Sequence, residues 1–397
     1  MILRRLLHGS RPPSIRSSTI FSPNETVLKE VLDHLGSRNS TILFLLSTSL
    51  PTSSLEPFLR VLNSHCPSSI GSFSIAAPGQ APSISIASFS SGSSTFQTSL
   101  SGRSDPEVGR WHRPRKVERE DLKGLDVGEI TAIESQDGWA GVWNAEKDVS
   151  TIPELEHSRA KSFLVLSDNH PDPVVQAING AVPSASAVGL MTAQTPFITG
   201  RPHTLFHNGQ ILSSGSVGIA IEEKLSTDID YRLEPLTEVF PVSRAQGNLL
   251  LNIDDGGEGN PARTLINALH RHKGRTGITK EEEWFLSIHS DGSGEPDNVV
   301  KILSGDPSRG VLSLETEISL RKGQSVQFLH RTQAIETSEP RAGVLAFATL
   351  HRDHHSVASE VSAGDARVVD GFVGHGEDGI IHGQSICKVP GAIVSAK

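Results

Sequence analysis

Short uninterrupted apolar runs are the first pattern along the chain. Residues 41–47 (TILFLLS) and 161–167 (KSFLVLS) are too short for ordinary helices and are rich in aliphatic and aromatic residues. This pattern favours strands that are covered on both faces. In each place a polar loop, a helical stretch, a proline and a second apolar run follow, so the same strand-helix-strand unit occurs twice.

The two predicted helices cover residues 54–63 and 173–180. A weaker third copy of the unit starts at residues 343–350 and resumes at 366–376, with a shortened middle that is rich in histidine. Because such strands must be covered, we expect helices to pack over the sheets. The fold class is therefore α/β or α+β, with mixed β-sheets covered by helices and built from internally repeated strand-helix-strand units.

Three other stretches complete the predicted elements. Asn208 and Gly209 form the clearest hairpin turn, between two short strand patterns. Residues 83–104 are dominated by serine and glycine, and we expect an exposed loop or a loosely packed edge there. A glycine-rich segment at residues 254–260 precedes a helix over residues 261–272.

The N-terminus differs from the rest of the chain in charge. Residues 1–23 contain no acidic residue, and residues 1–9 form a basic amphipathic pattern if they are helical. Pro12 and Pro13 interrupt any apolar core of a secretory signal. We therefore expect a mitochondrial transit peptide over residues 1–23 and a mitochondrial matrix protein, the alternative being a merely frayed basic end. The basic residues are Arg4, Arg5, Arg11 and Arg16.

Length, net charge and cysteine content limit the classes of function that this chain can have. The chain has 397 residues, enough for two ordinary domains, and a formal net charge of -9, which argues against nucleic acid as the main partner. No apolar run approaches the roughly 20 residues that a membrane span needs. The two cysteines, Cys66 and Cys387, exclude a disulfide framework and a cysteine-rich zinc site.

Three segments resemble the FIST family, named for F-box and intracellular signal transduction proteins. They are residues 188–221, 301–331 and 368–383, of which the last has the pattern G-F-x-x-x-G-E-x-G. The resemblance is to a fungal-type or mitochondrial member without an F-box, since no F-box helices precede the domain. Asp378 departs from the family pattern, which has an aliphatic residue there.

The resemblance implies an organisation and a function. A FIST N-terminal-like domain would cover residues 24–225, and a FIST C-terminal-like domain would cover residues 226–397. It implies a non-catalytic sensory domain for a small ligand, an amino acid or related metabolite, and the ubiquitin-ligase adaptor role of F-box relatives is not carried over.

The glycine-rich run around Glu377 is the main candidate ligand site. Closely spaced glycines let backbone N–H groups approach a ligand while one carboxylate is presented. Glu377 would accept from an ammonium group, and Arg201 or the amides would bind a carboxylate. The alternative is a glycine-rich turn with an ordinary exposed glutamate. The candidate ligand-binding residues are Gly371, Phe372, Gly374, Gly376, Glu377, Gly379 and Arg201.

Two histidine-containing segments are weaker candidates. His203 and His207 follow Arg201 and would contact an anion, although this segment also fits a turn before a strand in which His203 and Leu205 share one face. The run HRDHH contains potential zinc ligands at a spacing that is not diagnostic, and we expect it to be solvated. Its residues are His351, Arg352, Asp353, His354 and His355.

Three functions are compatible with these patterns. The first is a non-catalytic mitochondrial protein that binds a small metabolite, with no cofactor and no metal. The second is a structural or interaction subunit of a mitochondrial assembly, with a protein partner contacted by Trp111, Trp139, Trp143 and the basic run 110–116. The third is a metal-dependent hydrolase built on the HRDHH run, although H-E-x-x-H, P-loop and G-x-S-x-G motifs are absent.

Overall fold

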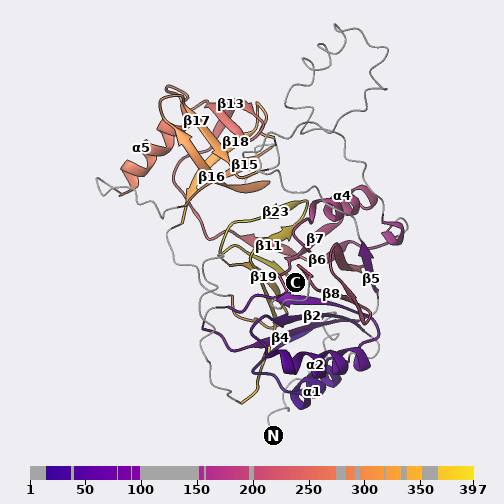
Figure 1. The fold of residues 1–397 in the computed structure, drawn as a ribbon. Coiled ribbons are helices and arrows are strands. Elements are labelled where there is room, and N and C mark those ends of the chain that lie inside the picture. The colour runs from indigo at the N-terminus through magenta and orange to yellow at the C-terminus, as the bar shows by residue number, and fades with distance from the viewer. Residues whose placement is uncertain are drawn as a thin grey trace, which may run out of the picture.

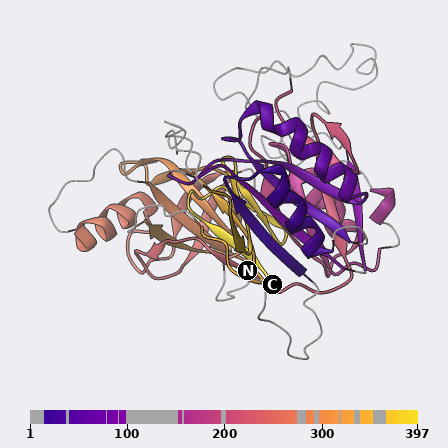
Figure 2. The same ribbon diagram turned by 90° about the horizontal axis from the view of Figure 1, so that it is seen from below.

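The computed structural model describes most of the chain from Ile15 to Lys397. The described ranges are 15–36, 40–77, 79–90, 92–98, 152–155, 158–195, 201–273, 283–290, 296–316, 319–331, 338–350 and 365–397. They form a layered body of three sheets and, beside it, a ring of strands (Figures 1 and 2). No described helix is long and apolar enough to cross a membrane.

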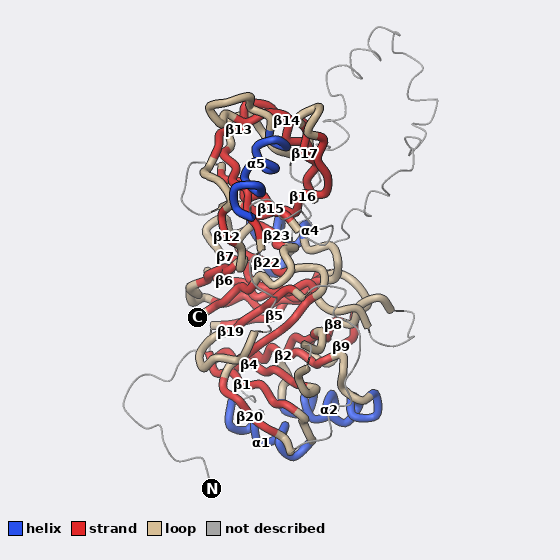
Figure 3. The backbone as a smooth tube through the Cα atoms, turned by 90° about the vertical axis from the view of Figure 1, so that its left-hand side faces the viewer, coloured by secondary structure: helices blue, strands red, loops and turns tan. Residues whose placement is uncertain are grey.

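Sheet A has seven strands, and two helices pack on one of its faces. In spatial order the strands are β20 (Arg367–Asp370), β1 (Ile15–Phe21), β4 (Ser83–Phe89), β2 (Thr41–Ser47), β3 (Ser69–Ser74), β8 (Leu205–His207) and β9 (Gln210–Leu212). The helices are α1 (Glu25–Leu35) and α2 (Thr52–His65), and they form the bottom layer in Figure 3. Asn24 caps α1, and Gly36 ends it in the left-handed conformation.

Sheets B and C lie on the other face of sheet A. Sheet B has the order β23 (Ser385–Cys387), β22 (Ile380–His382), β7 (Ser186–Met191), β6 (Ser162–Ser167), β10 (Ser216–Ile221) and β5 (Ser93–Thr98). Sheet C has the order β11 (Thr227–Asp230), β24 (Ile393–Ala396), β19 (Leu345–Thr349) and β21 (Phe372–Gly376). Helix α4 (Asp172–Ala181) and the short 3-10 helix η2 (Pro153–Leu155) pack on the outer face of sheet B.

Side-chain alternation along the strands explains these layers. In β2, Phe44 points into the core beneath α1 and α2, whereas Leu43 and Leu45 point into the core between the sheets. In β6, Phe163 packs towards α4, whereas Leu164 joins the same core between the sheets. The body is thus a helix-sheet-sheet-helix sandwich.

The expected mixed α/β class is found, but the expected helix cover is only partial. Helices cover one face of sheet A and part of the outer face of sheet B, and each sheet's other face is covered by another sheet. Strand pairs β2/β3 and β6/β7 are parallel with a helix between them. The pair β19/β21 is also parallel, but the described residues between them form β20 rather than a helix.

The expectation of an exposed loop or a loosely packed edge over residues 83–104 is wrong for residues 83–89 and fits residues 93–98 as an edge, while residues 99–104 lie outside the described part of the chain. Residues 83–89 form β4, a central strand of sheet A, and residues 93–98 form the edge strand β5. The serines of β4 are buried because their hydroxyls find partners. The Ser85 hydroxyl donates to the Val373 carbonyl at 2.7 Å and lies 3.0 Å from the Thr19 hydroxyl.

A closed ring of six antiparallel strands is inserted between β11 and β19. Its order is β18 (Ser325–His330), β13 (Phe240–Gln246), β14 (Leu249–Ile253), β17 (Val311–Leu314), β16 (Asn298–Asp306) and β15 (Trp284–His289), and β15 pairs with β18 to close it. The short strand β12 (Glu234–Pro235) extends β18, and α5 (Pro261–Lys273) packs against the ring. Ring closure leaves no open sheet edge.

The segment after the ring returns to the body. Strand β20 pairs with β1, β22 pairs with β7, and β24 pairs with β11. Figure 1 shows the yellow strand β23 between the ring and sheet A, whereas β20 is part of sheet A itself. The division proposed at residues 225 and 226 therefore separates segments that share sheets in the structure.

Strand β1 lies within the residues proposed as a presequence. It lies between β20 and β4, and the side chain of Ile20 is fully buried. A presequence that ended at Pro23 would include this strand. Removal of residues 1–23 would therefore take β1 out of sheet A, and the first fourteen residues lie outside the described part of the chain.

Candidate functional site

The carboxyl ends of three strands, each the second strand of a parallel pair in its own sheet, meet on one side of the body. The amide of Ala193, after β7, donates to the carbonyl of Phe73 in β3 at 3.2 Å. The amide of Met191 donates to the Gly379 carbonyl at 3.0 Å, and the amide of Ile75 donates to the His375 carbonyl at 2.9 Å. Loops after β3, β7 and β21 are therefore neighbours, at the kind of sheet edge where α/β proteins bind ligands.

Glu377 lies in this group of loops, directly after β21. Its side chain is half-buried, and Oε1 accepts from the Gln194 amide at 3.4 Å. Glu377 is therefore partly buried rather than fully exposed. The carboxylate is held beside the loop that follows β7.

His203 is a buried titratable group of the same region. Its side chain is 3% exposed, and Nδ1 lies 3.5 Å from the Thr192 hydroxyl. Burial lowers the pKa of His203, and the negative charges of Asp168, Asp378 and Glu377 oppose that shift. These three acidic residues, at the carboxyl ends of β6 and β21, are thus near enough to His203 to favour its protonated form.

Asp168 and Asp378 are not among the candidates that the sequence suggests. Asp168 follows β6, where its carboxylate accepts from the amides of Gly215 at 2.7 Å and His170 at 2.9 Å. Its position directly after a buried apolar strand is the sequence signal that could have found it. Asp378 stands out in the sequence only as a departure from the family pattern.

The glycines of the candidate run have structural explanations. A Cβ on Gly374 would lie 2.3 Å from Leu45, and one on Gly376 would lie 2.5 Å from the Met191 carbonyl oxygen. Gly371 has φ +115 and would meet the backbone of Arg341, and Gly379 has φ +145 and would meet the Cys387 carbonyl. Close packing against the protein requires glycine at these positions.

The remaining candidates differ in their surroundings. Phe372 is fully buried and packs on Phe347, with ring centroids 5.6 Å apart. Arg201 is exposed and precedes Pro202, whose carbonyl accepts from the Thr195 amide at 2.8 Å. Since Thr195 adjoins Gln194, Arg201 and Glu377 belong to one group of connected loops. Of the seven candidates, these two present charged groups there.

Hydroxyl groups of sheet A occupy the free edge of β21. Thr19 donates to the Gly371 carbonyl at 2.9 Å, and Ser85 donates to the Val373 carbonyl. The His375 amide donates to the Ser74 hydroxyl at 2.8 Å. The Gly371 and Val373 carbonyls and the His375 amide are thus engaged within the protein.

Several sequence candidates lie outside the described residues. They are the HRDHH run, Trp111, Trp139, Trp143 and the basic run 110–116. In the described part of the chain, no group of three or more histidine, cysteine, aspartate or glutamate side chains is arranged to hold a metal ion.

Comparison with protein families identifies this chain. The model of the FIST N domain matches residues 42–256, which is more than half of the chain. The chain belongs to the FIST family. The match covers β2 to β14 and includes Asp168, Arg201 and His203, whereas Glu377 lies beyond it. Comparison with curated proteins gives no match.

Proposed function

We propose that this FIST protein is a non-catalytic sensor that binds an amino acid or related metabolite at the loops around Glu377. The observation that carries the proposal is a half-buried carboxylate held by the Gln194 amide where the carboxyl ends of β3, β7 and β21 meet. Membership of the FIST family is consistent with small-ligand binding.

The charges of the site fit a zwitterion. Glu377, with Asp168 and Asp378 nearby, creates a negative potential at His203 that would also favour a ligand ammonium group. Arg201 supplies the exposed guanidinium that a ligand carboxylate would pair with, in a bidentate geometry suited to planar anions.

Isothermal titration of the full chain against the common amino acids tests the proposal. Matched amines and carboxylic acids, each lacking one charged group, serve as ligand controls. We expect Glu377→Gln and Arg201→Gln to weaken binding at least tenfold, by analogy with the loss of a charge-assisted hydrogen bond of about 1.5 to 3 kcal/mol. Glu315→Gln and Arg321→Gln, both exposed on the ring, are the matched variants that should bind normally. If no amino acid changes the heat or the melting temperature, the sensor proposal is wrong.

We also propose a mitochondrial matrix location, with a leader that ends before Ile15. The support is the basic, acid-free segment that contains Arg4, Arg5 and Arg11. Residues 1–14 fused to a fluorescent protein should direct it to mitochondria, and the same fusion with the three arginines replaced by glutamine should remain outside. Equal distribution of the two fusions would remove the basis for this location.

A further inference from the structure

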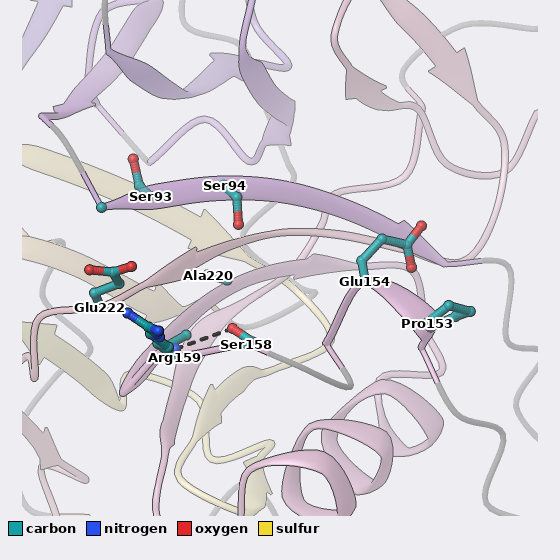
Figure 4. A pocket seen from close by; sticks show the side chains of 10 residues that line it. Ser93, Ser94, Pro153, Glu154, Ser158, Arg159, Ala220 and Glu222 are labelled. Atoms are coloured by element: carbon teal, nitrogen blue, oxygen red, sulfur yellow. Dashed lines mark hydrogen bonds between the residues drawn. The ribbon is translucent and has the colours of Figure 1, made fainter.

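A pocket lies on the outer face of sheet B, away from the Glu377 loop. It is open, has a volume of about 610 Å³, and lies near Ala220 and Glu222 at the end of β10 (Figure 4). Ala220 pairs with Phe163 near the beginning of β6, whereas the Glu377 loop contacts the residues after the end of β7. The two regions are therefore at opposite ends of sheet B.

Small side chains create the space for this pocket. Ser94 of β5 and Ala220 of β10 are paired across the two strands and form part of its lining. Helix α4 covers β6 and β7, while Ile152, Leu155 and Ala160 pack in the same outer core. The pocket lies between the segment that contains these three residues and strands β5 and β10. Its volume is in the range of small-ligand sites, roughly 300 to 1,000 Å³.

Charged side chains of both signs line the pocket. Figure 4 shows Glu222 and Arg159 towards one end and Glu154 towards the other. All three are exposed, and among the described residues Arg159 makes no ion pair. The amide of Glu222 donates to the Gly92 carbonyl at 2.9 Å, which fixes the rim at the Arg159 end. A ligand with a negative and a positive end matches this separation of charge.

The strand beside the pocket is the edge of sheet B. One side of β5 pairs with β10, and its other side has no strand partner in the described ranges. Such an edge presents a row of backbone N–H and C=O groups, which is the way an extended peptide is recognised by strand addition. A free amino acid is too short to use several of these groups at once.

We propose that this pocket binds a short extended peptide with free termini along β5, its carboxylate at Arg159 and its ammonium group at Glu154. The edge of β5 supplies main-chain hydrogen bonds, and the charges at the two ends select for uncapped peptides of limited length. Glu222 lies near the bound carboxylate in this arrangement. It would therefore disfavour peptides that end in an acidic residue.

Equilibrium dialysis with mass spectrometry tests the proposal on the full chain. The probes are a mixed-sequence library of tripeptides and tetrapeptides with free termini and the same library with acetyl and amide caps. We expect free peptides to be retained at least tenfold better than capped ones. Arg159→Gln and Glu154→Gln should each weaken retention at least tenfold, whereas Glu222→Gln should retain peptides at least as well.

Controls separate this pocket from other sites and from unfolding. Arg321→Gln and Glu223→Gln change exposed charges outside the pocket and should bind like the unmodified chain. Ser94→Trp places a large side chain in the pocket from an exposed position and should abolish retention without lowering the melting temperature. Glu377→Gln should retain peptides normally, even if it abolishes amino-acid binding.

Several results would overturn the proposal. The proposal is wrong if the chain retains no free peptide, or if it retains capped peptides as well as free ones. It is also wrong if a folded Ser94→Trp variant still retains free peptides. If the Glu377→Gln variant no longer retained peptides, the peptide-binding site would be the Glu377 loops and not this pocket. Retention of single amino acids that depends on Arg159 would reassign the pocket to them.

Discussion

Acid sensitivity of the fold depends on His375, a buried histidine in β21. Its side chain is 3% exposed, and among the described residues Nε2 has no hydrogen-bond partner. Burial lowers the pKa of His375 from 6.5 to about 4, with no charged side chain contributing. The folded protein therefore keeps this ring neutral at a pH where the unfolded chain binds a proton.

The sign and size of the effect follow from proton linkage. Between pH 6.5 and 4 the unfolded state carries about one more proton at His375, so the free energy of unfolding falls as the pH falls. Integration over the two pKa values gives a loss of about 2 kcal/mol at pH 5 and about 3 kcal/mol at pH 4, relative to pH 7.5. Above about pH 7.5 the contribution is constant, because His375 is then neutral in both states.

Urea unfolding of the full chain and of His375→Leu, at pH 7.5, 6, 5 and 4, measures this loss. Leucine has a similar volume and does not titrate, and the backbone amide of residue 375 keeps its bond to Ser74. His203 and His207, whose pKa values burial also lowers, titrate equally in both proteins and cancel in the difference. The unmodified chain should lose about 2 kcal/mol more than the variant by pH 5. A difference that stays constant from pH 7.5 to 4 would show that the ring is not held neutral by burial.

Three further predictions concern packing and the N-terminus. Gly189→Ala should prevent folding or cost more than about 3 kcal/mol, because its Cβ would lie 1.8 Å from a carbonyl oxygen of β6; the yield of soluble protein and its circular dichroism check this. Leu45→Ala in the core between the sheets should cost about 2 to 5 kcal/mol in urea unfolding, whereas Leu303→Ala, at a side chain 56% exposed, should change stability by less than about 0.5 kcal/mol. Deletion of residues 1–14 should leave the melting temperature unchanged, and deletion of residues 1–23 should lower it or abolish the transition, because the second deletion removes β1.

Local patterns were predictable from the sequence because their causes are local. The run 41–47 forms β2, and the helices expected at 54–63 and 173–180 lie within α2 and α4. The Asn208–Gly209 turn joins β8 to β9, with both residues at positive φ. In each case apolar periodicity, prolines and turn residues act within about fifteen residues of one another.

Long-range partners could not be predicted in the same way. The serines of β4 resemble a loop in the sequence because serine does not drive burial by itself. They are buried because hydroxyls such as that of Ser85 bond to β21, 288 residues away along the chain. The ring was missed for a related reason, since its closure depends on the pairing of β15 with β18 rather than on any local pattern.

The candidate site at Glu377 depends both on local sequence patterns and on long-range strand pairing. Gln194 follows β7 and lies within the family match, whereas Glu377 follows β21 and lies beyond it. The two meet because the chain returns to the body after the ring and β22 pairs with β7. A ligand held by Glu377 and Arg201 would therefore link loops that are far apart in the sequence and stabilise the returned strands. Ligand at a hundred times its dissociation constant would add about 2.7 kcal/mol to the free energy of unfolding. Binding at this site would thus be reported by the packing of the C-terminal strands, which is where a sensor could transmit its signal.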